Sequence, residues 1–468
     1  MRVGLMTREY PPYVYGGAGV HVEYLSRELA RSIEVEVHAW GTPPESAKAP
    51  ETPLLPEPIG RNLQVFFEQP WDAISTGTSA KFRGALEALS LNLLEQLHLE
   101  KLDIIHTHTW YVSMAGFLAK KLYGIPFVLT THSLEPLRAW KAEQLGTGYA
   151  LSSWMERTAI LDADAIVAVS NGTKADILRA YPDVDPARIH VIYNGIDLDQ
   201  YQYTPRQDAL LKYGVDPHKP YVLFVGRITR QKGVTHLVDA IRYLPPGTQV
   251  VLCAGAPDTP EIATEMRDKV QALTHVDVAD VHNENHEPGV RPALVTVESD
   301  NVHNPPGHAV ATGDYSGRGH NIVWIEQMVS KEEAIQLYSH CAVFCCPSVY
   351  EPFGIINLEA MACRAPVVAS ATGGILEVVV DEEKSRTDGT EPTGHLIPFA
   401  ADTETSFPTD PDAFARDLAH HITALLNDPE KARVMGEAGR RRVEAHFSWT
   451  AIAAQTIDLY RTLIAAKP

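Results

Sequence analysis

The sequence lacks the features that would place it in a membrane or in an oxidising compartment. No run of about 18 apolar residues occurs among its 468 residues, so we expect no transmembrane helix. Its five cysteines include no C-x-x-C pair, which indicates buried free thiols in a reducing cytoplasm. The segment Met1–Thr7 has one basic residue and leads directly into a strand pattern, unlike a signal peptide.

Basic residues are also scarce. Lysine and arginine number 40 against 59 aspartates and glutamates, which gives a formal net charge of −19. Nucleic acids and anionic membranes bind basic surfaces, so we expect neither as a partner. A protein this acidic needs local positive charge to bind a phosphorylated ligand, so basic residues inside glycine-rich turns are informative. Whether the chain forms a homo-oligomer is left open.

The length of the chain predicts two lobes of roughly 200 residues each, because a single core of this size is rare. With 45% hydrophobic and 21% charged residues, the composition is that of an ordinary globular protein. Strand patterns alternate with amphipathic helical patterns, such as Gly19–Ala30 and Ser113–Leu122. This alternation predicts parallel, doubly wound sheets.

The expected strands fall into two series. The strand candidates of the first half are Val3–Thr7, Val35–Trp40, Leu63–Phe67, Asp103–Thr107, Phe127–Thr131 and Ala165–Val169. Those of the second half are Tyr221–Val225, Gln249–Ala254, Ile322–Ile325, Ala342–Cys346 and Pro366–Ala369. Between them a short strand enters a glycine turn at Val191–Asp197, and loop-like sequence continues to Lys219. We therefore expect a first lobe over 1–200, a second over 201–448 and a final helical segment over 449–468.

Two segments interrupt the alternation of strands and helices. Residues 276–320 contain several histidines among many Asn, Pro and Gly residues, and only one short strand candidate, Ala293–Glu298. They predict an irregular surface insertion rather than a metal site. The polar segment Asp381–Gly394 predicts a surface loop.

The most informative stretch is Glu351–Glu359, which follows an apolar strand pattern and leads into a helical one. Pro352 and Gly354 mark the turn. Backbone N–H groups and the positive end of the helix dipole then converge on one spot, which suits an anion. Two carboxylates beside an anion site suit a sugar joined to a phosphate.

The spacing of Glu351 and Glu359 resembles the E-x7-E motif of retaining glycosyltransferases of family 4, which have the GT-B fold. The resemblance covers nearly the whole chain outside 276–320. The stretches Thr7–Pro12 and Thr131–Arg138 resemble the actinobacterial glycogen synthase and α-maltose-1-phosphate synthase subgroup, which uses ADP-glucose. The resemblance implies an α/β GT-B fold: two Rossmann-like doubly wound lobes facing a deep cleft, with the last helix crossing back to the first lobe.

Two cations, Arg227 and Lys232, follow the strand Tyr221–Val225 and should emerge at the carboxyl edge of the sheet, where α/β proteins bind ligands. Together they can neutralise a diphosphate. The resemblance implies that they clamp the donor diphosphate, with the backbone at Phe353, Gly354 and Ile355 around the phosphate and sugar. It assigns Glu359 to the donor ribose and Glu351 to glucose hydroxyls.

In the first lobe, a glycine-rich turn ends at the helix that begins near Gly19, so bare backbone can approach a ligand. The resemblance assigns Gly17 to the donor. It also implies that His132, at the end of a strand, contacts the transferred sugar. His106 and His108 share one face of a strand, but two ligands are too few for a metal and the family acts without one. No metal and no cofactor are expected.

The acceptor side of the cleft is expected at Thr109, Trp110 and Tyr111, beyond the strand that carries the two histidines. Arg138 and Lys141 are candidates for contacting a phosphorylated acceptor.

The resemblance implies a retaining α-1,4-glucosyltransferase that uses ADP-glucose, with UDP-glucose as the alternative donor. Its acceptor is glucose 1-phosphate or the non-reducing end of glycogen. Two other classes stay open: a nucleotide-sugar 2-epimerase, which consumes donor without an acceptor, and a non-catalytic glucan-binding protein, which binds no nucleotide. A phosphorylase is disfavoured because no pyridoxal-lysine context is present.

Overall fold

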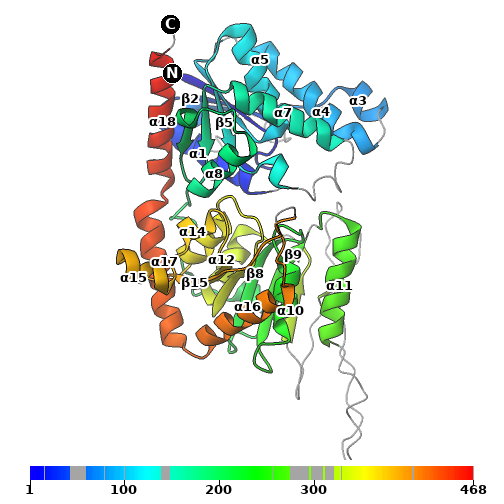
Figure 1. Ribbon diagram of the computed structural model, residues 1–468, viewed down its shortest axis with the longest axis vertical. Coiled ribbons are helices and arrows are strands. Elements are labelled where there is room, and N and C mark those ends of the chain that lie inside the picture. Colours follow the sequence, from blue (N-terminus) through cyan, green and yellow to red (C-terminus); the bar gives the residue numbers. More distant parts are fainter. Residues whose placement is uncertain are drawn as a thin grey trace, which may run out of the picture. The chain divides into compact units, whose positions relative to one another are not determined.

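The computed structural model describes most of the chain. The described residues are 1–14, 16–42, 59–77, 80–99, 101–138, 148–255, 257–274, 295–296, 309–310, 321–327, 329–402 and 405–466. They form two compact units, one made of Met1–Asp197 with Phe447–Pro468 and the other of Leu198–His446. The last helix therefore belongs to the first unit (Figure 1). Within the described parts of the chain, no helix combines the length and apolar character needed to cross a membrane.

The first unit contains a seven-stranded parallel sheet in the order β3-β2-β1-β4-β5-β6-β7. Its strands are β1 Arg2–Thr7, β2 Glu34–Trp40, β3 Leu63–Glu68, β4 Ile104–His108, β5 Phe127–Thr131, β6 Ala165–Ala168 and β7 Ile189–Val191. Its helices are α1 Gly17–Leu29, α2 Ile59–Asn62, α3 Asp72–Gly77, α4 Ala80–Leu94, η2 Glu95–His98, η3 Trp110–Val112, α5 Ser113–Tyr123, η4 Glu135–Leu137, α7 Gly148–Asp162, α8 Asn171–Ala180, η5 Pro186–Arg188 and α18 Trp449–Ala465.

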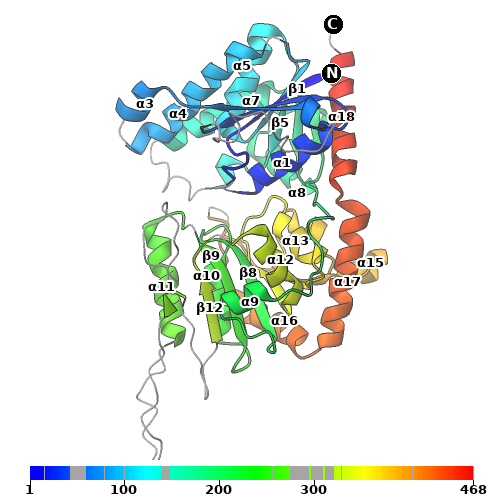
Figure 2. The same ribbon diagram turned by 180° about the vertical axis from the view of Figure 1, so that it is seen from behind.

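This sheet is buried on both faces, as a doubly wound fold requires. Successive residues of β5 alternate between two hydrophobic clusters. Val128 packs with side chains of α1 and α18, whereas Phe127 and Leu129 pack with side chains of α5 and α7. Opposite views show helices on both faces of the sheet (Figures 1 and 2). A strand buried on both faces reads as a continuous apolar run, which is why Phe127–Thr131 was predicted with its correct limits.

The second unit contains a six-stranded parallel sheet in the order β12-β9-β8-β13-β14-β15. Its strands are β8 Tyr221–Arg227, β9 Gln249–Gly255, β12 Asn321–Ile325, β13 Val343–Cys346, β14 Val367–Ser370 and β15 Gly394–Ile397. Its helices are α9 Asp208–Lys212, α10 Val234–Ile241, α11 Pro260–Thr274, α12 Lys331–His340, α13 Ile355–Ala362, α14 Ile375–Val378, α15 Glu382–Asp388, α16 Pro411–Leu426 and α17 Pro429–His446. Side chains of β8 and β9 pack with α10, α11 and α16 in one large cluster.

The predicted strands are present to within two residues at either end, but two loop predictions were wrong. The segment Asp381–Gly394 contains α15, because the side chain of Asp381 accepts the Lys384 N–H at 2.8 Å and Gly389 ends the helix with φ of 75°. Its last residue, Gly394, begins β15, which was not predicted. The loop-like stretch before Lys219 contains the short helix α9. Most of 276–320 lies outside the described residues, which include there only the antiparallel pair β10 Val295–Thr296 and β11 Ala309–Val310.

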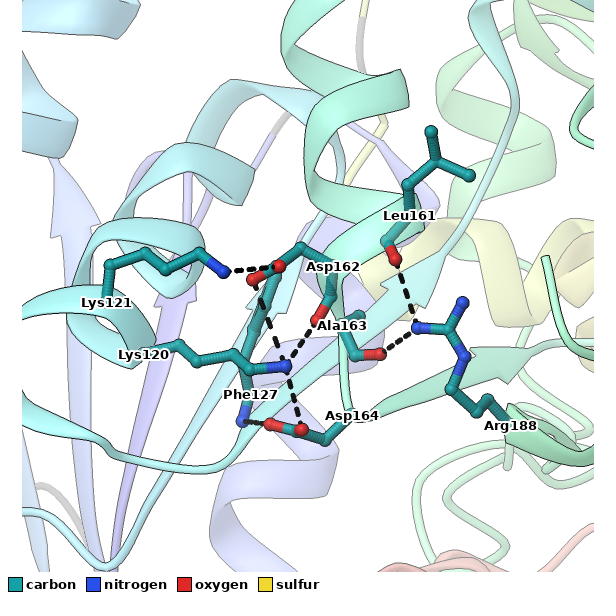
Figure 3. Close-up of polar contacts among 8 residues, drawn as sticks. All are labelled: Lys120, Lys121, Phe127, Leu161, Asp162, Ala163, Asp164 and Arg188. Carbon is teal, nitrogen blue, oxygen red and sulfur yellow. Dashed lines mark hydrogen bonds and ion pairs between the residues drawn. The ribbon is translucent and has the colours of Figure 1, made fainter. Parts of the chain in front are cut away.

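A polar cluster holds the amino-terminal ends of β5 and β6 together (Figure 3). Asp164 accepts the Phe127 N–H at 2.8 Å through Oδ2 and lies 2.8 Å from Lys120 Nζ through Oδ1. Lys120 Nζ also donates to the Asp162 carbonyl at 2.5 Å. Arg188 Nη1 donates to the Ala163 carbonyl at 2.5 Å. These contacts occupy donors and acceptors that the strand starts would otherwise leave unpaired.

We predict that Asp164→Ala destabilises the first unit, because it leaves the Phe127 N–H and the Lys120 ammonium without this partner. A loss of about 1.5 kcal/mol is expected, which lowers the melting temperature of a unit of this size by about 3–6 °C. The control is Asp183→Ala, which removes a largely exposed ion pair to Arg157. Equal melting temperatures for the two variants would show that the cluster does not support the strands.

Candidate active site

Lys232 lies in a tight turn between β8 and α10 that packs against the segment after β13. Gly233 has φ of 62°, and a Cβ there would lie 2.0 Å from the Pro347 carbonyl oxygen, so only glycine fits. Lys232 Nζ contacts Glu351 Oε2 at 2.6 Å, and Ser348 donates to the same oxygen at 3.3 Å. Lys232 and Glu351 are 119 residues apart in the chain. The fold therefore joins one predicted cation to one predicted carboxylate.

Arg227 is the last residue of β8. Its Nη1 donates to Asp258 Oδ1 at 2.7 Å, and both side chains are largely buried. Asp258 was missed from the sequence, although it follows β9, the neighbour of β8, at the same edge of the sheet. Both predicted cations therefore face a carboxylate. An anionic ligand that binds at this edge must either share the two cations with these carboxylates or replace the carboxylates.

The loop that carries Glu351 ends at α13. Gly354 precedes the helix with φ of 97°, and within the described structure no side-chain hydrogen bond caps the helix start. A Cβ at Gly373 would lie 2.1 Å from the Glu351 carbonyl oxygen, and the Gly374 N–H donates to that oxygen at 2.9 Å. The glycine pair after β14 therefore fixes the backbone of Glu351. A Gly-Gly pair after a strand was the signal that could have found this turn.

Glu359 lies within α13 and is held by two phenols. Tyr201 donates to Oε1 at 3.1 Å and Tyr338 donates to Oε2 at 3.0 Å. Burial raises the pKa of Glu359, and the two hydrogen bonds offset part of that rise because they stabilise the carboxylate. Each oxygen keeps a lone pair that could accept a ligand hydroxyl. Neither tyrosine was predicted.

In the first unit, the glycine turn before α1 is bound to Glu9. The Gly16 N–H donates to Glu9 Oε2 at 2.6 Å, and a Cβ at Gly19 would lie 2.8 Å from Glu9 Cβ. Gly17, the predicted donor contact, is the exposed first residue of α1. Gly16 is thus held by a hydrogen bond and Gly19 by close packing against Glu9, whereas Gly17 is exposed.

His132 belongs to a group of buried imidazoles. Its Nε2 lies 3.1 Å from His108 Nδ1, and nitrogens of His21, His108 and His132 all lie within 4.8 Å of one another. Asn194 Oδ1 accepts from His21 Nδ1 at 2.6 Å, which leaves His21 Nε2 buried without a partner among the described residues. His106, the other strand histidine, contacts Tyr460 Oη and Thr130 Oγ1, each at 2.6 Å.

These imidazoles are neutral at ordinary pH. Burial lowers the pKa of His21 to about 4 and that of His106 to about 3. Burial and the neighbouring imidazoles hold the pKa values of His108 and His132 well below their usual range. A neutral imidazole has one donor and one acceptor nitrogen, so with Nε2 facing His108 the other nitrogen of His132, Nδ1, is the one that can hydrogen-bond a ligand. His21, which lies on α1, was not predicted. The prediction of too few ligands for a metal therefore left out one of the three imidazoles that meet here.

The residues after β4 have a strained backbone. Thr109 has φ of 73°, an unfavourable value for a β-branched residue that costs about 1–3 kcal/mol, and its Oγ1 is buried without a partner in the described structure. Trp110 and Tyr111 stack at 4.0 Å between ring centroids. Strain of this kind collects at binding and catalytic sites, so Thr109 is a candidate ligand contact, and its assignment to the acceptor stays a prediction.

Arg138 is held in a buried network. Its Nη1 donates to Ser133 Oγ at 3.0 Å and lies 3.6 Å from Glu135 Oε1. Glu156 Oε1 accepts the Glu135 N–H at 2.9 Å and the Tyr181 hydroxyl at 2.5 Å. Burial, with the nearby charge of Glu135, raises the pKa of Glu156 to about 8. Lys141, the second predicted phosphate contact, lies outside the described residues.

The parallel doubly wound sheets of the two units are the fold of GT-B proteins, and two family models identify the class as glycosyltransferase. The Glycosyltransferase Family 4 model matches residues 15–200, and the Glycosyl transferases group 1 model matches residues 317–442. Alpha-maltose-1-phosphate synthase from Mycolicibacterium smegmatis is 43% identical, over 99% of this chain and 100% of that protein. The chain belongs to glycosyltransferase family 4.

Solved structures agree on the fold. Sucrose-phosphate synthase from Thermosynechococcus elongatus superposes with a TM-score of 0.67 at 23% identity, over 99% of each chain. The catalytic domain of starch synthase IV from Arabidopsis thaliana, bound to ADP and acarbose, superposes with a TM-score of 0.66 at 19% identity, again over 99% of each chain.

We predict that Glu156 makes the stability of the first unit depend on pH. Above its ordinary pKa of 4.5 the unfolded chain loses this proton while the folded chain keeps it, so stability falls as the pH rises toward 8. Glu156→Gln keeps an acceptor oxygen but cannot ionise, so its melting temperature should fall less than that of the wild type between pH 5 and pH 8, by several degrees.

The control for this prediction is Glu34→Gln, at an exposed glutamate of β2. It should follow the wild-type curve. Parallel curves for Glu156→Gln and the wild type would contradict a raised pKa at Glu156.

Proposed function

We propose that this glycosyltransferase is a retaining α-1,4-glucosyltransferase that moves glucose from ADP-glucose to glucose 1-phosphate and so forms α-maltose 1-phosphate, in α-glucan synthesis in the cytoplasm. The observation that carries the proposal is the Lys232–Glu351 contact, which places at one sheet edge a cation and the carboxylate that we assign to the sugar hydroxyls. The name of the relative that is 43% identical over its full length supports the choice of acceptor. Solved structures with the same fold hold ADP in one case and UDP-glucose in another, so the choice of ADP-glucose is a proposal that the product assay below decides.

In this proposal the second unit binds the donor. Arg227 and Lys232 bind the diphosphate, and the uncapped N–H groups at Gly354 and Ile355 add the positive end of the α13 dipole. The backbone of Phe353 lies in the same turn. Glu359, oriented by its two tyrosines, accepts hydrogen bonds from the ribose hydroxyls. Glu351 accepts from glucose hydroxyls.

The chemical step breaks the bond between the glucose anomeric carbon and the diphosphate oxygen. The bonding electrons leave with the nucleotide, so positive charge develops on the sugar and negative charge on the diphosphate. Arg227 and Lys232 stabilise that negative charge, and most of the rate enhancement is expected from this stabilisation. An acceptor hydroxyl then attacks from the same face and gives its proton to the departing phosphate, so the anomeric configuration is retained.

The first unit provides the remaining contacts. The exposed Gly17 backbone lies beside the donor, and neutral His132 hydrogen-bonds a hydroxyl of the transferred glucose. A charged base is not needed there, because the leaving phosphate takes the proton. Thr109 and Tyr111 contact the acceptor sugar, and the buried Trp110 supports Tyr111 by stacking on it. Arg138 adds positive charge near the acceptor phosphate, and Lys141, outside the described residues, is proposed for the same role.

We predict that Arg227→Ala and Lys232→Ala each lower kcat roughly 100-fold or more, because each removes a cation that acts on the transition state. Acceptor KM should change much less. The control is Lys219→Ala, an exposed lysine of the same unit that lies 3.6 Å from Asp216. Steady-state kinetics measure all three, and a wild-type kcat in both site variants would contradict the proposed diphosphate contacts.

A product assay tests the proposed reaction itself. The purified chain is incubated with ADP-glucose or UDP-glucose and with glucose 1-phosphate, glycogen or no acceptor, and the products are identified by mass spectrometry. From ADP-glucose and glucose 1-phosphate we expect a disaccharide phosphate with the mass of maltose 1-phosphate. Elongated glycogen would instead assign the other acceptor, and donor consumption without an acceptor would indicate an epimerase.

The same assay examines the imidazole group. Three histidine nitrogens at this spacing could also ligate Zn²⁺. We propose transfer without a metal, so dialysis against EDTA should leave the rate unchanged. A loss that Zn²⁺ restores would show that His21, His108 and His132 hold an ion.

A further inference from the structure

A pocket of about 430 Å³ opens at the carboxyl edge of the first sheet, on the loops that follow β1 and β2. It is lined by Arg8, Glu9, Tyr13, Val14, Trp40 and Gly41. Its walls are mostly apolar and aromatic. Arg8 is the cation in this lining, in a chain whose net charge is −19.

The guanidinium of Arg8 is oriented by aromatic rings rather than by carboxylates. It lies 4.3 Å from the ring centroid of Tyr111 and 5.5 Å from that of Trp40. No described residue forms an ion pair or a hydrogen bond with it. The adjacent carboxylate of Glu9 instead accepts the Gly16 N–H at 2.6 Å. The donors of Arg8 are thus available to a ligand while its position is fixed by the rings.

Arg138 has a different environment. Its side chain is 12% exposed, and Ser133 and the buried Glu135 occupy its Nη1. Burial raises the pKa of Tyr111, and the charges of Arg8 and Arg138 act on the same hydroxyl in the opposite direction. Both cations therefore lie near Tyr111. Only Arg8 combines this position with an exposed guanidinium.

We propose that this pocket binds the phosphate group of a sugar-phosphate acceptor, with Arg8 as its principal phosphate contact. The planar guanidinium matches two phosphate oxygens. The exposed Tyr13 ring and Trp40 offer apolar faces for the sugar ring. The proposal rests on the proposed function and adds a residue that selects phosphorylated acceptors over neutral glucans.

Direct binding tests this without turnover. Glucose 1-phosphate is titrated by calorimetry into the wild type, Arg8→Gln, Arg8→Lys and the control Arg31→Gln. Arg31 belongs to the same unit but is 61% exposed and pairs with Glu28 at 2.9 Å. We expect Arg8→Gln to weaken binding by roughly 10- to 100-fold, the usual effect of losing a charged hydrogen-bond partner. Arg8→Lys should recover part of this loss, and Arg31→Gln should match the wild type.

Kinetics separate this inference from the proposed function. If the wild type forms the disaccharide phosphate, Arg8→Gln should raise the KM for glucose 1-phosphate far more than it lowers kcat. If the wild type forms none, the proposed reaction fails while the titration still decides the role of Arg8. Wild-type affinity in a folded Arg8→Gln variant, or no binding by the wild type, would overturn the inference.

Discussion

The contact between Lys232 Nζ and Glu351 Oε2 is the interaction on which the account of the site depends. It joins the loop after β8 to the loop after β13, two neighbouring strands of the second sheet. Tight glycine packing on both sides holds the loops: Gly233 against Pro347 and Gly373 against Glu351. A side chain at Gly233 would push the loop after β8 away from Pro347, and one at Gly373 would displace the backbone of Glu351.

Before any ligand binds, the carboxylates that face Arg227 and Lys232 stabilise the folded chain by neutralising these cations. An unpaired cation pair at a partly buried edge would be poorly solvated and mutually repulsive. Asp258 and Glu351 remove that cost. In the proposed function a diphosphate replaces them, because it offers more charge and more acceptor oxygens. The pairing of cations also distinguishes two arginines of the first unit. Arg138 already interacts with the buried Glu135, whereas Arg8 packs on aromatic rings and keeps its N–H donors for a ligand.

Much of the fold could be predicted from the sequence, because buried parallel strands such as Phe127–Thr131 leave a continuous apolar signal. The segment Asp381–Gly394 was misjudged, since its polar composition masked an N-cap and a C-terminal glycine. Among the predicted site residues, Glu351 and Lys232 were chosen from local motifs, and the structure shows them in contact. Asp258, Tyr338 and His21 were not, because their importance comes from contacts between elements distant in the chain.

The first unit shows the same limit. Arg8 stands in a stretch noted only for its resemblance to a subgroup, and the sequence gives no sign that its guanidinium rests on Tyr111. That contact depends on the adjacency of β1 and β4, which are separated by about a hundred residues of chain but pair directly in the sheet. Contacts of this kind, between residues that are close at a sheet edge but distant in the chain, cannot be predicted from local sequence motifs.

The central claim is tested most directly by an experimental structure of the protein with ADP. The account predicts that the β-phosphate oxygens lie within hydrogen-bond distance of both Arg227 and Lys232, with the ribose hydroxyls on Glu359. ADP bound elsewhere, with the Arg227–Asp258 and Lys232–Glu351 pairs intact and no phosphate beside them, would contradict it.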